Sequence, residues 1–218
     1  MENKDDLLMQ YRNIYAERRL ILDKMQKIHK KNPYTVNHHN NQKSSVCFIF
    51  SCPGQDELVN NRVCFGETGE NLDILLHYLV NQRCDVFNSR NRYDYDILNT
   101  SNVVHFYALD KKTQAGIREI NKHFEEIQKY IIANTNLSYI ILFGKKAELI
   151  DSKIQKVVDD TKRDIKIITG IKHLGYQALN QIDKDIHGNE IDESHYPTPE
   201  ARTSARLGVV AQKILSQL

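Results

Sequence analysis

The sequence predicts an α/β protein in which a parallel sheet of four strands lies between layers of helices. Continuous apolar runs at 46–50 and 139–143 are typical of strands that are buried on both faces. Segments with apolar residues at three- and four-residue steps alternate with the strands along the chain. Strands that alternate with helices form a parallel sheet with helices on both faces, which gives a three-layer sandwich.

The individual elements follow from the same patterns. Residues 5–28 are expected to form one amphipathic helix, and 29–45, rich in Asn, His and Lys, a linker or mobile loop. We therefore expect an N-terminal helix and linker over 1–45 and an α/β domain over 46–218. Within that domain the predicted strands are 46–50, 101–107, 139–143 and 165–168, and the predicted helices are 68–82, 116–134, 145–150 and 199–216.

Composition and charge narrow the class of protein. The 218 residues, 40% of them apolar and 27% charged, suit one globular core. No apolar run approaches the ~18 residues of a membrane helix, and the chain begins with polar residues, so we expect no membrane partner and a cytoplasmic location, nucleoid-associated if the source is bacterial. Residues 1–43 hold nine Lys/Arg and five Asp/Glu, a net charge of +4, whereas the remainder is at −2. Any phosphate contact must therefore come from local basic clusters.

The four cysteines lack the spacing of a metal site. Cys47, Cys52, Cys64 and Cys84 contain no close pair, and two ligands from one turn usually converge on a zinc ion or an iron–sulfur cluster. Cys47 also lies in an apolar strand, where burial is expected. We predict no metal and no organic cofactor.

Five short motifs resemble those of the uracil-DNA glycosylase superfamily, in the family's order. They lie at 51–57, 62–73, 101–105, 140–147 and 172–175. In style they are most similar to the bacterial and archaeal iron–sulfur branch, but the spaced cysteines that hold its cluster are missing. The resemblance implies a uracil-DNA glycosylase-like fold and a DNA glycosylase that flips out uracil or a modified pyrimidine and hydrolyses its N-glycosidic bond. Base excision repair and defence against modified DNA are the roles it suggests, with single- or double-stranded DNA as the partner.

The resemblance also assigns a base-binding pocket. The family's stacking Phe aligns with Cys64, and a shift of one residue places Phe65 there. Asn102 falls at the position that reads a pyrimidine edge, for which an amide offers a donor and an acceptor. Gly54 and Gln55 complete the expected base-binding set, Gly54 because its backbone can approach a ligand closely. The alternatives are that Phe65 is a core residue and that the local backbone satisfies Asn102.

The candidate catalytic residues match the family's motifs less closely than the base-binding residues do. His173 falls where the family uses a His to stabilise the departing base, and a surface His in a loop is the alternative. The family places Asp, Asn or Glu in the first motif to position water, whereas this chain has Ser51 and Cys52 there. Asp56 and Glu57 are the nearby carboxylates and therefore the candidates for assisting a water molecule.

Contacts to DNA phosphates are expected around the same loops. The N-terminus of the helix near residue 68 can hold a phosphate. The expected phosphate contacts are Thr68, Lys145, Lys172, Gly175 and Tyr176. Surface solubility explains Lys145 and its neighbour Lys146 equally well.

Two other functions remain open. A non-catalytic member of the superfamily would bind nucleic acid or a nucleobase and signal through the N-terminal helix, which would then contact a protein partner. An unrelated doubly wound α/β protein would bind a small molecule or nucleotide, although no GxGxxG or Walker loop follows a strand.

Overall fold

One parallel sheet organises the protein, seen in a computed structural model that describes residues 3–13, 19–40 and 42–218. The strands are β1 (Val46–Phe50), β2 (Asp96–Asn99), β3 (Tyr139–Phe143) and β4 (Lys166–Ile171). Their order in the sheet is β2-β1-β3-β4, and all pairs are parallel. The register places Phe48 opposite Ile97 of β2 and Ile141 of β3. The predicted four-stranded parallel sheet is confirmed.

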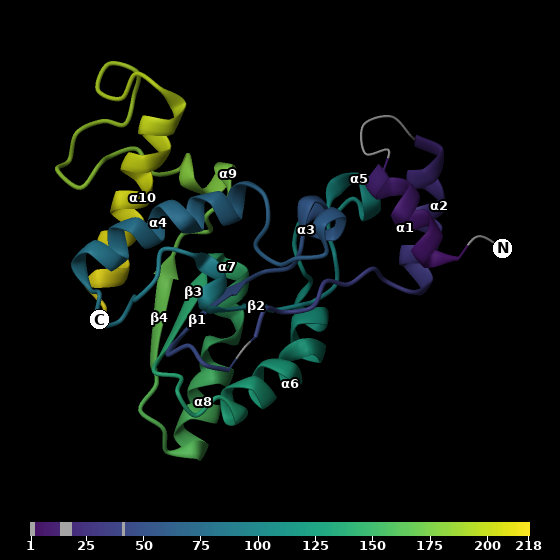
Figure 1. Ribbon diagram of the computed structural model, residues 1–218, viewed down its shortest axis with the longest axis horizontal. Coiled ribbons are helices and arrows are strands. Elements are labelled where there is room, and N and C mark those ends of the chain that lie inside the picture. Colours follow the sequence, from purple (N-terminus) through teal and green to yellow (C-terminus); the bar gives the residue numbers. More distant parts are fainter. Residues whose placement is uncertain (1–2, 14–18, 41) are drawn as a thin grey trace.

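Helices cover both faces of this sheet (Figure 1). The long covering helices are α4 (Glu67–Gln82), α6 (Ile117–Ala133), α8 (Asp151–Thr161) and α10 (Pro199–Leu215). Because successive strand residues point to opposite faces, Phe48 packs in the core under α4 and α10, whereas Cys47 and Ile49 pack in the core under α6 and α8. The arrangement is a three-layer sandwich, as predicted.

Short helices mark the carboxyl edge of the sheet, since one follows each strand. They are α3 (Gln55–Asn60), α5 (Tyr107–Asp110), α7 (Gly144–Ala147) and α9 (Tyr176–Leu179). Single 3₁₀ turns lie at η1 (Arg92–Asp94) and η2 (Glu148–Ile150). Among the helices that the structure describes, none is long and apolar enough to cross a membrane.

The N-terminal segment is part of the main core. In place of one predicted helix over 5–28 there are α1 (Lys4–Asn13) and α2 (Arg19–Lys31), and residues 14–18 lie outside the described part of the chain. Tyr11 and Met25 are buried in the same core as Phe48. Figure 1 shows α1 and α2 beside α3 and α5, at the end of the molecule near the carboxyl edge of β2.

The segment after α2 is held against β2, although the sequence predicted a linker or mobile loop. The backbone of His39 exchanges two hydrogen bonds with Ile97, at 3.0 and 2.7 Å, and the N–H of Val36 donates to the carbonyl of Asn102. These bonds cover the outer edge of the sheet, where an unpaired strand would otherwise expose its backbone groups.

The second strand lies earlier in the chain than predicted, at Asp96–Asn99 rather than 101–107. Residues after Asn99 stay bonded to the end of β1 and to the loop that follows it, since the N–H of Thr100 donates to the Phe50 carbonyl at 2.8 Å. The Thr100 hydroxyl donates to the Ser51 carbonyl at 2.6 Å, and the N–H of His105 donates to the Pro53 carbonyl at 2.9 Å. The segment after β2 is therefore tied to the loop after β1.

Candidate functional site

A cavity of about 510 Å³, here called the central cavity, opens at the carboxyl edge of the sheet. The loop after β1, the turn at Cys64, the end of β2 and the loop after β4 contribute to its wall. Ligands of open parallel sheets bind beyond the carboxyl ends of the strands. Two of the segments that the sequence singled out, 51–57 and 172–175, thus meet in one cavity.

Glu57 ties two parts of the wall together. Its Oε2 accepts the N–H of Gly54 and its Oε1 accepts the N–H of Cys64, both at 2.6 Å. Burial raises the pKa of Glu57 to about 7, although the two backbone donors act in the opposite direction. A carboxyl group that titrates near neutral pH therefore lies in the cavity wall with one hydrogen bond on each oxygen.

Ser51 and Cys52 occupy the position directly after β1. The Ser51 hydroxyl donates to the Cys52 sulfur at 3.7 Å. Burial raises the pKa of the Cys52 thiol to about 12. Because the thiolate is the nucleophilic form, Cys52 is unreactive near neutral pH.

His173 lines the central cavity as a neutral ring with one unused donor. The N–H of Gly175 donates to its Nδ1 at 3.0 Å, so the proton of the neutral ring lies on Nε2. Burial lowers the pKa of His173, which favours this neutral form. Phe50 packs edge-on against the ring, with 5.8 Å between the ring centroids, and within the described residues Nε2 has no hydrogen-bond partner.

Gly144 makes room for this ring. Its φ of +83° favours glycine, and a Cβ there would lie 3.0 Å from the Cβ of His173. The turn after β3 therefore fixes the position of a side chain on the loop after β4.

Asn99 supplies an amide to the cavity. It ends β2, is 2% exposed, and its Nδ2 is buried without a hydrogen-bond partner. An unpartnered buried amide is costly unless a ligand satisfies it. Asn102, the amide that the sequence singled out, is half-buried, and it is not among the described residues that line the central cavity.

The structure places the candidate residues from the sequence in three locations. Those at the central cavity are Ser51, Cys52, Gly54, Glu57, Cys64, Thr68, His173, Gly175 and Tyr176. Lys145 and Lys172 line an adjoining cavity of about 630 Å³, here called the lysine cavity, to which Ser51 and His173 also contribute. Outside the described walls of both cavities are Gln55, Asp56, Phe65 and Asn102.

Gln55, Asp56 and Phe65 lie outside the described walls of both cavities, where they contact other segments or are exposed to solvent. The Gln55 side chain donates to the Tyr11 hydroxyl of α1 at 2.9 Å. Asp56 is exposed, and its carboxylate lies so close to Gly66 that a Cβ there would be 2.5 Å from Oδ2. Phe65 is 36% exposed, whereas its neighbour Cys64 is buried in the cavity wall. Of these two neighbours, only Cys64 lies in the described wall of the central cavity.

A second histidine in the wall, His105, has both nitrogens engaged. Its Nδ1 is 2.5 Å from Oδ2 of Asp110, and its Nε2 is 2.9 Å from Oε2 of Glu119. Burial lowers its pKa, but the bonds to Glu119 and Asp110 outweigh that effect, so the pKa of His105 lies above its usual value. Both nitrogens of His105 therefore face carboxylates, which favours the charged form of its ring.

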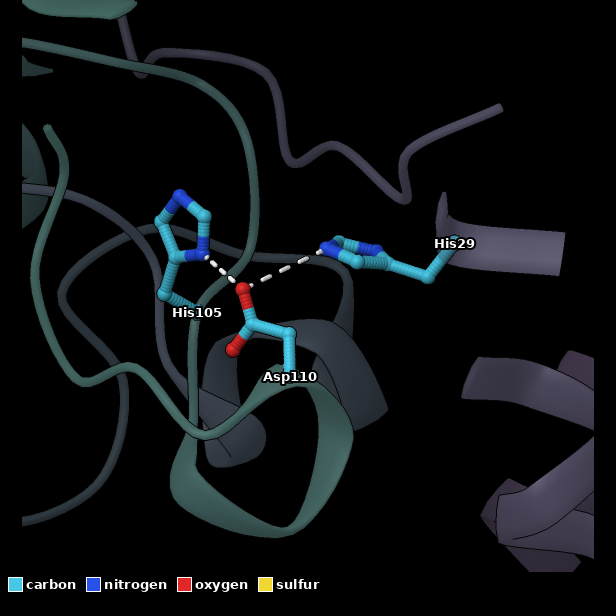
Figure 2. A group of neighbouring side chains, drawn as sticks. All are labelled: His29, His105 and Asp110. Carbon is cyan, nitrogen blue, oxygen red and sulfur yellow. Dashed lines mark hydrogen bonds and ion pairs between the residues drawn. The ribbon is translucent and has the colours of Figure 1, made fainter. Parts of the chain in front are cut away.

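His29 of α2 joins this group, as Figure 2 shows: the His29 and His105 rings both direct a nitrogen at Asp110. The Nε2 of His29 is 3.8 Å from Oδ2 of Asp110, and the three ligand atoms lie within 4.8 Å of one another. Two His and one carboxylate are a common metal-binding set. The hydrogen bonds of the three residues decide whether a metal fits between them.

The arrangement does not fit a metal ion. The N–H of Tyr34 donates to Nδ1 of His29 at 3.1 Å, so the Nε2 that faces Asp110 carries the proton of the neutral ring. A metal needs a lone pair at that nitrogen, and it would also displace the proton between His105 and Asp110. The three side chains instead connect α2 to the cavity wall, through the hydrogen bond between His105 and Asp110 and the contact between His29 and Asp110.

The wall also contains residues that the sequence did not single out as candidates, among them the polar residues Asn99, His105 and Gln114. The signal for Asn99 was a polar residue directly after the apolar pair Ile97-Leu98, which ends a strand. His105 and Gln114 lie in loops, and the sequence gives no pattern that assigns them.

No protein-family model matches the chain, and no curated protein is significantly similar to it. The cavity and its side chains are therefore the basis for a functional proposal.

Proposed function

We propose that the protein is a DNA glycosylase of the uracil type, which takes an extruded pyrimidine into the central cavity and hydrolyses its N-glycosidic bond. The observation that carries the proposal is the pair Asn99 and His173: a buried amide and a neutral imidazole, each with an unused N–H donor, line the same cavity. The edge of a pyrimidine offers carbonyl oxygens that such donors bind.

The pair suits the chemistry of a departing base. When the N-glycosidic bond breaks, its electron pair stays on the base, which becomes an anion, and a water oxygen bonds to the sugar carbon and loses a proton. A donor that is already in place stabilises the charge that develops on a base oxygen. His173 is suited to this task because burial lowers its pKa and keeps Nε2–H available on a neutral ring.

Glu57 is the candidate acceptor for the proton of the water. The carboxylates in the described wall of the central cavity are Glu57 and Glu67, and Glu67 is exposed at the helix start. Because the pKa of Glu57 is about 7, a sizeable fraction is ionised at neutral pH, and each oxygen keeps a second lone pair.

The alternative is a non-catalytic protein that binds a nucleobase in the same cavity. Two observations favour it: Ser51 and Cys52 offer neither a carboxylate nor an amide after β1, and both oxygens of Glu57 already accept backbone N–H groups. This alternative predicts binding without release of a base.

The test uses the full chain and end-labelled oligonucleotides that carry one uracil or one modified pyrimidine, followed by alkali to cleave abasic sites. We expect strand scission by the wild type, lost in Asn99→Ala and His173→Ala. Asn102→Ala is the matched control, since it removes a neighbouring amide outside the described wall, and it should retain scission. Binding by fluorescence anisotropy without scission on the whole panel would support the alternative, and neither binding nor scission would refute both.

A further inference from the structure

The lysine cavity adjoins the central cavity. It has a volume of about 630 Å³, and both cavities are lined by Ser51, Gln114 and His173. A ligand in the central cavity would therefore lie beside a second, larger cavity, with these shared side chains contributing to both walls.

The charge of the lysine cavity suits an anion. Lys145, Lys146 and Lys172 line it, with Glu148 as the one carboxylate in its described wall. Lys213 of α10 lies close by but outside the described wall, since a Cβ at Gly170 would be 3.1 Å from its Nζ.

These ammonium groups are not neutralised by neighbouring carboxylates. Within the described residues none of the three lysines of the wall forms an ion pair, and Lys172 donates to the neutral side chain of Gln181 at 3.0 Å. Three positive charges on a concave surface raise the local concentration of an anionic ligand.

Part of the same wall is apolar. Leu149 is 43% exposed although it lines the cavity, and Ile171 and Ala178 lie in the wall with it. A nucleotide meets both conditions, because its phosphate is charged and its base presents a flat apolar face.

We propose that the lysine cavity binds the nucleotide next to the extruded one, with its phosphate on the lysines and its base against Leu149. This inference rests on the proposed function and adds a separate site for the neighbouring nucleotide of the strand. It also predicts a preference for the base at the neighbouring position, because that base is held in a cavity.

The first experiment measures the affinity of the full chain for a short single-stranded oligonucleotide at several salt concentrations. For single strands, each phosphate that the protein neutralises adds about 0.7 to the steepness of log affinity against log salt. We expect Lys145→Glu and Lys172→Glu each to make the slope shallower by this amount. Lys156→Glu is the matched control, since it makes the same charge change on the exposed side of α8 and should leave the slope unchanged.

The second experiment distinguishes a strand from a free nucleotide and tests the base. Deoxyuridine monophosphate should bind at least tenfold more weakly than a trinucleotide with uracil in the middle. Replacing the neighbouring base by an abasic spacer should weaken wild-type binding several-fold and have no effect in Leu149→Asp.

The outcomes separate this inference from the proposed function. If no base is released from any substrate but the lysine variants still make the salt slope shallower, the glycosylase proposal fails and the strand-binding cavity stands. If Lys145→Glu and Lys172→Glu behave like Lys156→Glu, or if the monophosphate binds as tightly as the trinucleotide, the inference is overturned.

Discussion

Two histidines in the wall of one cavity have opposite environments. His173 has one backbone partner, no carboxylate beside it and a pKa lowered by burial. His105 lies between Asp110 and Glu119, and their hydrogen bonds raise its pKa against the effect of burial. Within the same wall, burial therefore favours the neutral form of the His173 ring, and two carboxylates favour the charged form of the His105 ring.

The difference shows which histidine has capacity left for a ligand. Both nitrogens of His105 are occupied, so its role is to hold the segments that carry Asp110 and Glu119 together. His173 keeps Nε2–H unused, and an unused donor in a cavity is free to bind a substrate atom. We therefore expect substitutions of His173 to change mainly the rate of base release, and substitutions of His105 to change mainly the free energy of unfolding.

The largest expected effect is that of His173→Ala on the rate of base release. Removing one preorganised donor to a developing anion costs about 10²–10³ in rate, and we expect a loss in this range in single-turnover assays. The unfolding free energy, measured in urea, should change far less. A rate within a few-fold of the wild type would show that the unused donor does not act on the base.

His105→Gln should instead act on stability. The substitution leaves Asp110 and Glu119, which are 15% and 20% exposed, near each other without the cation between them. Breaking such a buried pair costs about 3 kcal/mol, which urea denaturation at pH 6 would measure. Adding Glu119→Gln should recover part of the loss, because it removes one uncompensated carboxylate. Equal destabilisation by His173→Gln would contradict the comparison.

The stability contribution of His105 should also depend on pH. A raised pKa in the folded state contributes stability that is fully present below the unfolded value of about 6.5 and is lost as pH rises through the folded value. The difference in unfolding free energy between wild type and His105→Gln should therefore shrink above pH 6.5.

The stability contribution of His29, in the same group of side chains, should depend on pH in the opposite direction. Burial lowers its pKa, and protonation of Nδ1 would break the bond from the Tyr34 N–H. Its contribution is present above about pH 6.5 and is lost as pH falls towards the folded value. A His29→Gln series that follows the same direction as His105→Gln would show that the two rings do not differ as the hydrogen bonds indicate.

Much of the fold was predictable because β1 and β3 are continuous apolar runs. The second strand was not, because it begins with the buried Asp96, whose carboxylate accepts hydrogen bonds from Tyr130 and Asn134 of α6 and its C-terminal end. These partners lie far along the chain, so local sequence gives no sign that a charged residue can begin a buried strand. The strand was therefore predicted over the residues that follow it.

The residues of the candidate site could likewise be predicted only where they depend on strands that the sequence identifies. Ser51 and His173 directly follow strands that the sequence identifies, so their meeting at one sheet edge could be predicted. Asn99 depends on where β2 ends, and the error in that strand led to Asn102 in its place. His105 depends on contacts with Asp110 and Glu119, which only the folded chain brings together.

The smallest expected effect tests how firmly His173 is positioned. Gly144→Ala forces a Cβ into a left-handed turn, which costs about 1–2 kcal/mol, and that Cβ would lie 3.0 Å from the Cβ of His173. Gly188→Ala is a matched control, since its φ of +87° is nearly the same as the +83° of Gly144 and a Cβ there meets nothing within 4 Å. Both variants should lose stability in urea, Gly144→Ala the more because of its contact with His173, and only Gly144→Ala should slow base release, by several-fold. If both leave the rate unchanged, the turn after β3 does not position the ring, and the neutral histidine reaches its ligand through the loop after β4 alone.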